Sequence, residues 1–197
     1  MEFMRETIMT TQIIDYVLDD NCFEKTLKML MEDKVGAIHC DTVYGLCAKA
    51  NEVNSEKLYR IKNRPENKNF ITLTSFKWLE KSSLTIPEVL YDHWPCSLTA
   101  ILSDKDGITH AVRVPDDEFV LSLVDIVGPI YSTSANLSGE PILNTPEDIF
   151  KVFNNKIDFI IDKKITNADF IPSTLVNFTT RPYKIIRAGS YDVSSII

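Results

Sequence analysis

The sequence predicts a single α/β domain, and three observations lead to that prediction. Helix-like segments, with apolar residues three and four positions apart, alternate with short strand-like runs along the chain. No internal repeat, low-complexity tract or linker interrupts this alternation. The chain has 197 residues, of which 44% are hydrophobic and 25% charged, a composition that suits one soluble domain with a sizeable core.

An amphipathic helix and a buried strand come first. Four apolar residues fall on one face of this helix: Phe23, Leu27, Leu30 and Met31. The run 35–40 predicts a buried strand, and Gly45 marks a turn within 41–46.

A second helix has Ser55 as its predicted N-cap, with Leu58 and Ile61 facing the core. It ends before Pro65, because the residue that precedes a proline avoids the helical region. The alternating run 69–74 predicts the next strand.

The second half of the chain continues the alternation and includes a helix that starts with Pro146, a favourable first-turn residue. In order, we expect helical patches around 78–79 and 87–93, strands at 98–102 and 110–114 joined by the acidic turn 103–107, a helical stripe at 119–127, a short strand at 130–131, a helix at 146–153, and strands at 159–161, 174–176 and 184–186.

Charge and hydropathy narrow the function classes. A net charge of −7 makes the protein as a whole a poor non-specific binder of nucleic acid or anionic membrane, although local basic patches are compatible with it. No apolar run approaches the ~20 residues needed to span a bilayer. Residues 1–11 lack the basic and apolar regions of a signal peptide. We therefore expect a cytoplasmic protein that does not bind membranes.

The cysteines and histidines predict no intrinsic metal site. The four cysteines form no CxxC pair, and only three histidines are present. A structural zinc site needs closer ligand spacing, so we expect reduced, packed thiols. The glycine-rich phosphate loops GxxxxGK and GxGxxG are absent, as is the nucleophile motif GxSxG.

One stretch concentrates polar side chains at the end of a strand. Residues 132–138 hold four hydroxyls and one carboxamide, and the turn residues Gly139 and Pro141 follow. Small polar side chains leave room for a ligand and offer both donors and acceptors, so this stretch is a candidate binding site. The alternative is a loop whose hydroxyls cap its own backbone.

Five cations lie next to chain breaks, where side chains usually face an open site: Lys62, Arg64, Lys68, Arg113 and Arg187. Arginine suits bidentate recognition of phosphate or carboxylate, and lysine supplies a point charge. We expect Lys62 and Arg64 to be exposed at a helix end. Taken singly, each cation is more often a solvated surface charge, and Arg113 would then pair with Asp116 or Asp117.

As a set, seven segments resemble motifs of the YrdC-like threonylcarbamoyl-AMP synthases, in family order over residues 12–190. They are 41–46 (the threonine-binding turn), 62–65 (Lys-x-Arg-Pro), 94–99 (Trp-Pro-Gly-Pro-Leu-Thr in the family), 109–115 (Val-Arg-x-Pro), 132–139 (Ser-Thr-Ser-Ala-Asn-x-Ser-Gly), 173–176 (Ser-Thr-Val-Val) and 186–189 (Arg-x-Gly). The resemblance implies a twisted mixed parallel and antiparallel sheet with flanking helices and an open concave site. Residues 1–11 are then an N-terminal extension and 191–197 a C-terminal tail, as in the short, single-domain form of the family.

The chain also departs from the family pattern. His39 and Cys40 stand where the family has Pro-Thr, Asn69 replaces a proline, Leu73 stands where many members have histidine, Cys96 and Ser97 replace Gly-Pro, and Lys163 and Lys164 replace a glycine pair. None of these departures removes a ligand-contacting cation, but together they indicate a divergent member.

The resemblance implies a nucleotidyltransferase that joins L-threonine, bicarbonate and ATP into threonylcarbamoyl-AMP and pyrophosphate. This product supplies a threonylcarbamoyltransferase complex that modifies adenosine next to the anticodon of certain tRNAs. The implied threonine and bicarbonate residues are Thr42, Arg113, Ser132 and Ser173. The implied ATP residues are Lys62, Arg64, Lys68, Thr109, Ser134, Asn136 and Arg187. Mg²⁺ would arrive with ATP, and positioning with charge neutralisation would supply the rate without an assigned general base.

Other interpretations stay open. A divergent paralogue of the same fold would bind a nucleotide or RNA without making the adenylate. An RNA-binding module would hold an RNA backbone weakly on a basic concave face, although the acidic net charge argues against it. A carbamoyl-transferring maturation factor would need a much longer chain.

Overall fold

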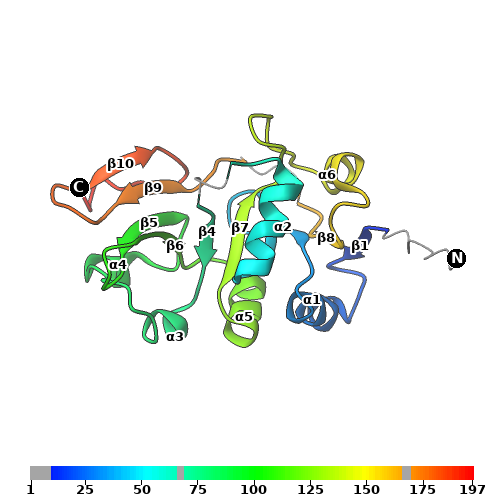
Figure 1. Ribbon diagram of the computed structural model, residues 1–197, viewed down its shortest axis with the longest axis horizontal. Coiled ribbons are helices and arrows are strands. Elements are labelled where there is room, and N and C mark those ends of the chain that lie inside the picture. Colours follow the sequence, from blue (N-terminus) through cyan, green and yellow to red (C-terminus); the bar gives the residue numbers. More distant parts are fainter. Residues whose placement is uncertain (1–9, 66–68, 166–169) are drawn as a thin grey trace, which may run out of the picture.

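One mixed sheet of ten strands organises the described residues of the computed structural model, which are 10–65, 69–165 and 170–197 (Figure 1). The strands are β1 (Gln12–Asp15), β2 (Gly36–His39), β3 (Tyr44–Lys49), β4 (Ile71–Leu73), β5 (Leu98–Ser103), β6 (Thr109–Arg113), β7 (Ile130–Ser134), β8 (Phe159–Asp162), β9 (Thr174–Asn177) and β10 (Lys184–Arg187). The helices are α1 (Cys22–Met31), α2 (Glu52–Lys62), α3 (Phe76–Leu79), α4 (Val89–His93), α5 (Glu118–Val127) and α6 (Pro146–Phe153). The strand order is β1-β8-β2-β3-β7-β4-β6-β5-β9-β10.

The sheet combines both kinds of strand pairing. β8 pairs in parallel with both β1 and β2, and β4–β6 and β5–β9 are also parallel. The central strand β7 is antiparallel to β3 on one side and to β4 on the other. The predicted mixed sheet with flanking helices is therefore confirmed, and β7 carries the polar stretch into the middle of the sheet.

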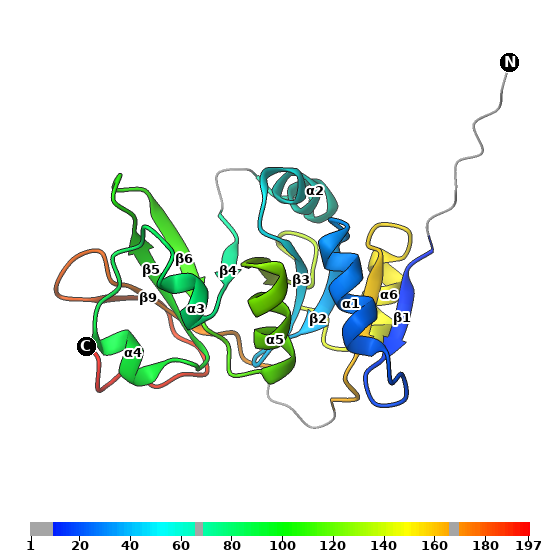
Figure 2. The ribbon, with the colours of Figure 1, turned by 90° about the horizontal axis from the view of Figure 1, so that it is seen from below.

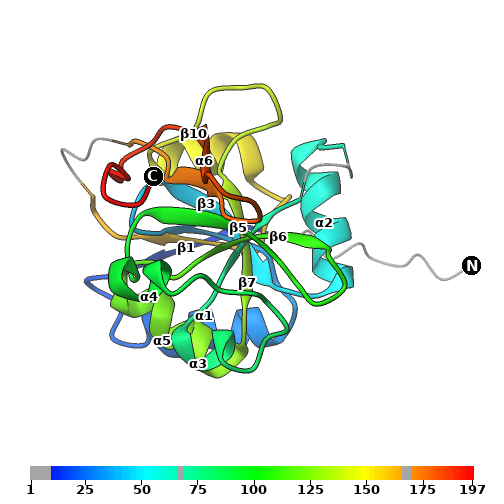
Figure 3. The ribbon, with the colours of Figure 1, turned by 90° about the vertical axis from the view of Figure 1, so that its left-hand side faces the viewer.

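The helices cover both faces of this sheet. Figure 2 shows α1 and α5 together in front of the strands, and Figure 3 shows α2 and α6 on the opposite side. Their buried residues form separate apolar clusters, one with Leu30 and Leu123 and one with Leu58 and Phe153. A third cluster, which includes Leu90, lies under α3 and α4 against β5, β6 and β9. Within the described ranges, no helix has both the length and the apolar character to cross a membrane.

Short polar side chains cap the N-termini of α2 and α5. The side chain of Asn51 accepts a hydrogen bond from the Asn54 N–H at 2.9 Å and caps α2, so the prediction that Ser55 is the cap was wrong. The cap lies four residues earlier because Asn51 has the extended backbone that the position needs. Asp117 caps α5 in the same way through the Val120 N–H at 3.0 Å.

Two further details differ from the sequence-based expectation. Met31, expected on the buried face of α1, is 59% exposed, whereas the polar Thr26 is fully buried and donates to the Cys22 carbonyl. Gly45 was expected in a turn but lies within β3, opposite Ser134. A Cβ at Gly45 would lie 2.5 Å from the Ser132 Oγ, so the glycine marks a close approach between strands.

Candidate functional site

A cavity of about 220 Å³ lies between β3, β4, β6 and β7 on one side and the segment that includes β9 and β10 on the other. Its lining residues are Thr42, Val43, Gly45, Arg64, Asn69, Phe70, Ile71, Ala111, Arg113, Ser132, Thr133, Ser134, Ile142, Pro172, Ser173, Leu175 and Arg187. Three of them are arginines, and no aspartate or glutamate belongs to the described part of the wall. The cavity therefore suits an anionic ligand.

Arg113, the last residue of β6, forms the most deeply buried charge of this wall. Its side chain is 5% exposed, and its Nη1 donates to the Thr42 Oγ1 at 3.2 Å. The Nη2 lies 3.2 Å from the Asp41 Oδ1, an ion pair that lacks hydrogen-bond alignment. The Nε has no partner among the described residues. A buried guanidinium that retains an unpartnered N–H and lines a cavity is suited to bind a carboxylate.

The counter-charge of Arg113 is thus Asp41, and the alternative of a pair with Asp116 or Asp117 was wrong. Asp117 instead pairs with Lys163 at 2.5 Å. Burial raises the pKa of Asp41, and the positive charge of Arg113 opposes that rise. Sequence reasoning missed Asp41 as a site residue, although it directly precedes Thr42 in the motif that was singled out.

Ser132 occupies the floor of the cavity next to β3. Its Oγ accepts a hydrogen bond from the Cys47 Sγ at 3.6 Å and fills the space that a side chain at Gly45 would take. Ser132 and Gly45 both line the cavity, and Ser132 is 7% exposed. A hydroxyl held in this way can exchange hydrogen bonds with a bound ligand.

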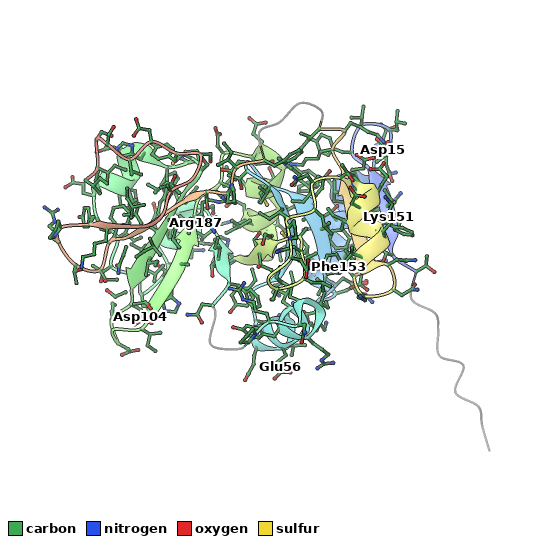
Figure 4. All side chains as sticks on the ribbon, turned by 90° about the horizontal axis from the view of Figure 1, so that it is seen from above. Asp15, Glu56, Asp104, Lys151, Phe153 and Arg187 are labelled. Atoms are coloured by element: carbon green, nitrogen blue, oxygen red, sulfur yellow. The ribbon has the colours of Figure 1, made fainter. Side chains whose placement is uncertain are left out.

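The opposite wall joins Ser173 to Arg187. The Arg187 Nε and Nη2 donate to the Ser173 carbonyl at 3.2 and 2.8 Å, and the Nη2 also reaches the Ser173 Oγ at 3.2 Å. Figure 4 labels Arg187 in the half of the molecule that holds β5, β6, β9 and β10. Partial burial, together with the charge of Arg113, lowers the pKa of Arg187. The two arginines therefore act on the same region of the cavity.

Lys62 differs most from its predicted exposure. It is only 1% exposed and does not line the cavity. Its Nζ donates to the Ser134 carbonyl, to the Asn136 carbonyl at 2.7 Å and to the Asn136 Oδ1 at 2.9 Å. Burial, reinforced by the charge of Arg64, lowers the pKa of Lys62 to about 7. The prediction of an exposed lysine was wrong because the loop after β7 folds over the end of α2.

Arg64 and Asn136 complete this corner. The Arg64 Nη2 donates to the Asn69 carbonyl at 2.9 Å, and the guanidinium lies 5.4 Å from the centre of the Phe70 ring. The Asn136 side chain lies behind the wall, where its Oδ1 accepts from the Ser134 Oγ at 2.6 Å. Arg64 and Ser134 line the cavity, so Lys62 and Asn136 support residues that a ligand can reach.

Thr109, another predicted ATP residue, does not line this cavity. Thr109 is exposed at the start of β6 and lines a neighbouring hollow of about 290 Å³, together with Tyr59 and Tyr131. The two hollows meet at Asn69, Phe70 and Ala111. Lys68 lies outside the described residues. The structure thus brings together seven of the eleven predicted residues: Thr42, Arg64, Arg113, Ser132, Ser134, Ser173 and Arg187.

No cluster of three or more histidine, cysteine, aspartate or glutamate side chains able to hold a metal occurs in the part of the chain that is described. The described wall of the cavity contains hydroxyls but no carboxylate that could bind Mg²⁺. These residues therefore suit Mg²⁺ only as an ion that enters with the phosphates of a nucleotide.

The fold and the cavity together define an α/β protein with an arginine-lined site for an anionic ligand. A family model that covers Sua5, YciO and YrdC, described as "Telomere recombination", matches residues 28–189. The chain belongs to this Sua5/YciO/YrdC family.

Individual relatives agree with this assignment. The threonylcarbamoyl-AMP synthase of Pyrococcus abyssi is 32% identical over a match of 183 positions, which covers 85% of this chain and 54% of that protein. A putative threonylcarbamoyl-AMP synthase of Methanocaldococcus jannaschii is 29% identical, with 92% of this chain and 94% of that protein covered. The crystal structure of P. abyssi Sua5 complexed with L-threonine superimposes with a TM-score of 0.83 at 28% identity, over 94% of this chain and 59% of that one. The chain thus spans about half the length of the P. abyssi relative and nearly all of the M. jannaschii one.

Proposed function

We propose that this protein is an L-threonylcarbamoyladenylate synthase, which condenses L-threonine, bicarbonate and ATP to threonylcarbamoyl-AMP and pyrophosphate. One observation carries the proposal: the buried Arg113, whose Nε has no partner among the described residues, lines a cavity that contains hydroxyls and no described carboxylate. That chemistry suits the carboxylate of a small hydroxylated amino acid. The names of the relatives, and the L-threonine complex of P. abyssi Sua5, support the choice of threonine.

Each wall of the cavity has a distinct task in this reaction. Arg113 holds the threonine carboxylate, while Thr42, Ser132 and Ser173 bond its remaining polar groups. The threonine amine adds to carbon dioxide from bicarbonate, and a carbamate oxygen then attacks the α-phosphorus of ATP as pyrophosphate leaves. Arg64 and Arg187 neutralise phosphate charge at the rim, and Mg²⁺ bound to ATP would share that charge. A nucleotide that extends past Ala111 would reach Thr109 in the neighbouring hollow.

Lys62 and Asn136 serve the ATP side indirectly in this proposal. Lys62 fixes the backbone of Ser134 and Asn136, and these two side chains bond to each other. Positioning and charge neutralisation then supply most of the rate, so the reaction needs no dedicated general base in the wall. We further propose a cytoplasmic enzyme that passes its product to a threonylcarbamoyltransferase complex acting on tRNA.

A paralogue that binds nucleotide or RNA without making the adenylate is the second candidate, and the substituted residues favoured it. In the structure, His39, Cys40 and Leu73 are at least nine-tenths buried and contribute nothing to the described wall. Of the substituted positions, Asn69 alone is found on the described wall. These substitutions therefore give little reason to expect a changed reaction.

The test is pyrophosphate release by the purified protein with ATP, bicarbonate and each amino acid in turn. We expect release only when L-threonine and bicarbonate are both present, with serine a weak substitute. Release that ignores threonine would point to another acyl adenylate or to plain nucleotide hydrolysis. Tight RNA binding that weakens steeply between low and moderate salt would favour the RNA-binding candidate instead.

Arg113→Lys tests the binding of threonine separately from the binding of ATP. Lysine keeps the charge but cannot form two parallel bonds to a planar carboxylate, so the threonine requirement should rise by about five- to thirtyfold, or about 1–2 kcal/mol. ATP affinity should stay close to that of the wild type. Arg60→Lys, on the exposed side of α2, is the matched control and should change neither titration. Equal loss for both ligands, or for neither, would contradict the role of Arg113.

A further inference from the structure

Among the ion pairs of the described residues, the one between Asp41 and Arg113 is the pair that involves an arginine of the cavity wall. Its side chain is 6% exposed, and its Oδ1 lies 3.2 Å from the Arg113 Nη2. Asp41 does not line the cavity. A ligand in the cavity would therefore meet Arg113, with Asp41 behind it.

The carboxylate is itself fixed in place. Its Oδ2 accepts a hydrogen bond from the Asp116 backbone N–H at 3.2 Å, just after β6 ends at Arg113. The residue that follows Asp41 is Thr42, whose Oγ1 accepts from the Arg113 Nη1 at 3.2 Å. Two consecutive residues thus hold the two terminal nitrogens of one guanidinium.

This arrangement fixes the orientation of the whole guanidinium. Arginine presents its donors in a rigid planar fork, so fixing Nη1 and Nη2 also fixes the direction of the Nε–H. The Nε has no partner among the described residues. The same contact places one negative charge beside Arg113, one of the three wall arginines. It therefore lowers the net positive charge in the part of the cavity around Arg113, which we call the deep end.

We propose that Asp41 is a positioning residue for Arg113, which holds the guanidinium in the orientation that binds the substrate carboxylate and limits the positive charge of the deep end to what a single carboxylate needs. This role rests on the proposed function, since it assigns Arg113 to the carboxylate of threonine. It also predicts a specificity: the deep end accepts the monocarboxylate of a zwitterion and disfavours inorganic phosphate and other dianions.

Asp41→Asn tests both parts, because it keeps the shape and an acceptor for the Asp116 N–H but removes the charge. We expect the threonine KM for pyrophosphate release to rise about tenfold, a coupling typical of contacting residues. The kcat and the ATP KM should change by less than about twofold, because Asp41 lies behind the threonine end of the wall. Inhibition by inorganic phosphate should become stronger, since the deep end gains one positive charge. A merely structural loss would weaken both the inhibition by phosphate and the binding of threonine, and that result would overturn the proposal.

Two controls tie the effect to Arg113. Asp116→Asn makes the same chemical change on an exposed side chain nearby and should leave the threonine KM and phosphate inhibition unchanged. In an Arg113→Lys background, Asp41→Asn should alter the threonine KM by less than about twofold, because its effect passes through the guanidinium. A full tenfold effect in that background would show that Asp41 acts by another route.

A measurement without substrate distinguishes this proposal from the proposed function. In ¹⁵N-arginine-labelled protein, the Arg113 Nε–H resonance, identified by its absence in Arg113→Lys, should shift and exchange faster with water in Asp41→Asn. The same resonance should be unaffected in Asp116→Asn. If the wild type ignores threonine but the resonance responds in this way, the function fails and the positioning role stands. An unchanged resonance in Asp41→Asn would refute the positioning role whatever the substrate.

Discussion

Lys62→Met should destabilise the fold, although lysine at the end of a helix is usually a tolerant position. The substitution keeps the length and apolar character of the side chain and removes the ammonium. Three oxygens then lose a donor: the carbonyls of Ser134 and Asn136 and the Asn136 Oδ1. The Asn136 Oδ1 keeps the Ser134 Oγ as a donor at 2.6 Å, and the Ser134 carbonyl keeps the Asn136 backbone N–H at 2.9 Å. Among the described residues, the Asn136 carbonyl therefore loses its donor without a replacement.

The expected loss follows from the Asn136 carbonyl. An unsatisfied buried acceptor costs about 1–3 kcal/mol, so the free energy of unfolding should fall by about that amount. Burial, reinforced by the charge of Arg64, already disfavours the charged ammonium, so removing the charge gives back only part of this loss. Lys62→Ala should cost more, since it also leaves a cavity.

Urea unfolding followed by tryptophan fluorescence measures this loss. Lys28→Met is the matched control, because the Lys28 side chain is 77% exposed and its nearest carboxylate oxygen is 3.9 Å away. That control should change the unfolding free energy by less than about 0.5 kcal/mol. A Lys62→Met protein of wild-type stability that binds ATP weakly would refute this reasoning and make Lys62 a direct phosphate ligand.

Two other substitutions test separate parts of the structure. Burial and the charge of Lys163 lower the pKa of His39 to about 4; since the unfolded side chain titrates near about 6.5, the unfolded state binds more protons between these values, and stability should fall by about 3 kcal/mol as the pH drops through that window. His39→Phe has no group at this position that titrates in this window, so its stability should not show this loss when it is compared with the wild type. Wild-type and variant stabilities that fall in parallel with pH would contradict the assignment. Gly189→Ala would put a Cβ 2.3 Å from the Pro172 carbonyl oxygen, so it should cost about 1–3 kcal/mol and raise the ATP requirement by disturbing Arg187 and Ser173; an unchanged melting temperature would show that this backbone can move apart.

The local chemistry of the sequence predicted most helices and strands but not how distant segments meet. Periodicity located α5 and β8, and the proline located the start of α6. The four-residue β1 was not predicted, because so short a run becomes a strand only by pairing with β8. Gly45 was assigned to a turn, since nothing near it in the sequence reveals that the Ser132 side chain occupies the space beside it.

The candidate site was predictable in its members and less so in their contacts. The hydroxyls of β7 and three of the cations line one cavity, as the motifs indicated. The burial of Lys62 depends on a loop more than 70 residues further along the chain, and the contact of Asp41 with Arg113 spans a similar distance. Neighbouring residues carry no signal for such contacts. The resemblance singled out these side chains, and the structure separates those that line the cavity from those that lie behind it.

The cavity also has a consequence for how the protein acquires its activity during synthesis. Its wall draws on residues from Thr42 to Arg187, and the contact of Arg113 with Thr42 alone spans 71 positions. Contacts so distant in sequence form late, because the entropy of closing the intervening chain must be overcome first. A ribosome-bound chain whose β10 has not yet left the ribosome already contains Arg64 and Arg113, but the cavity that they line is incomplete. Substrates therefore cannot guide early folding, and they can stabilise the protein only after the whole sheet has formed.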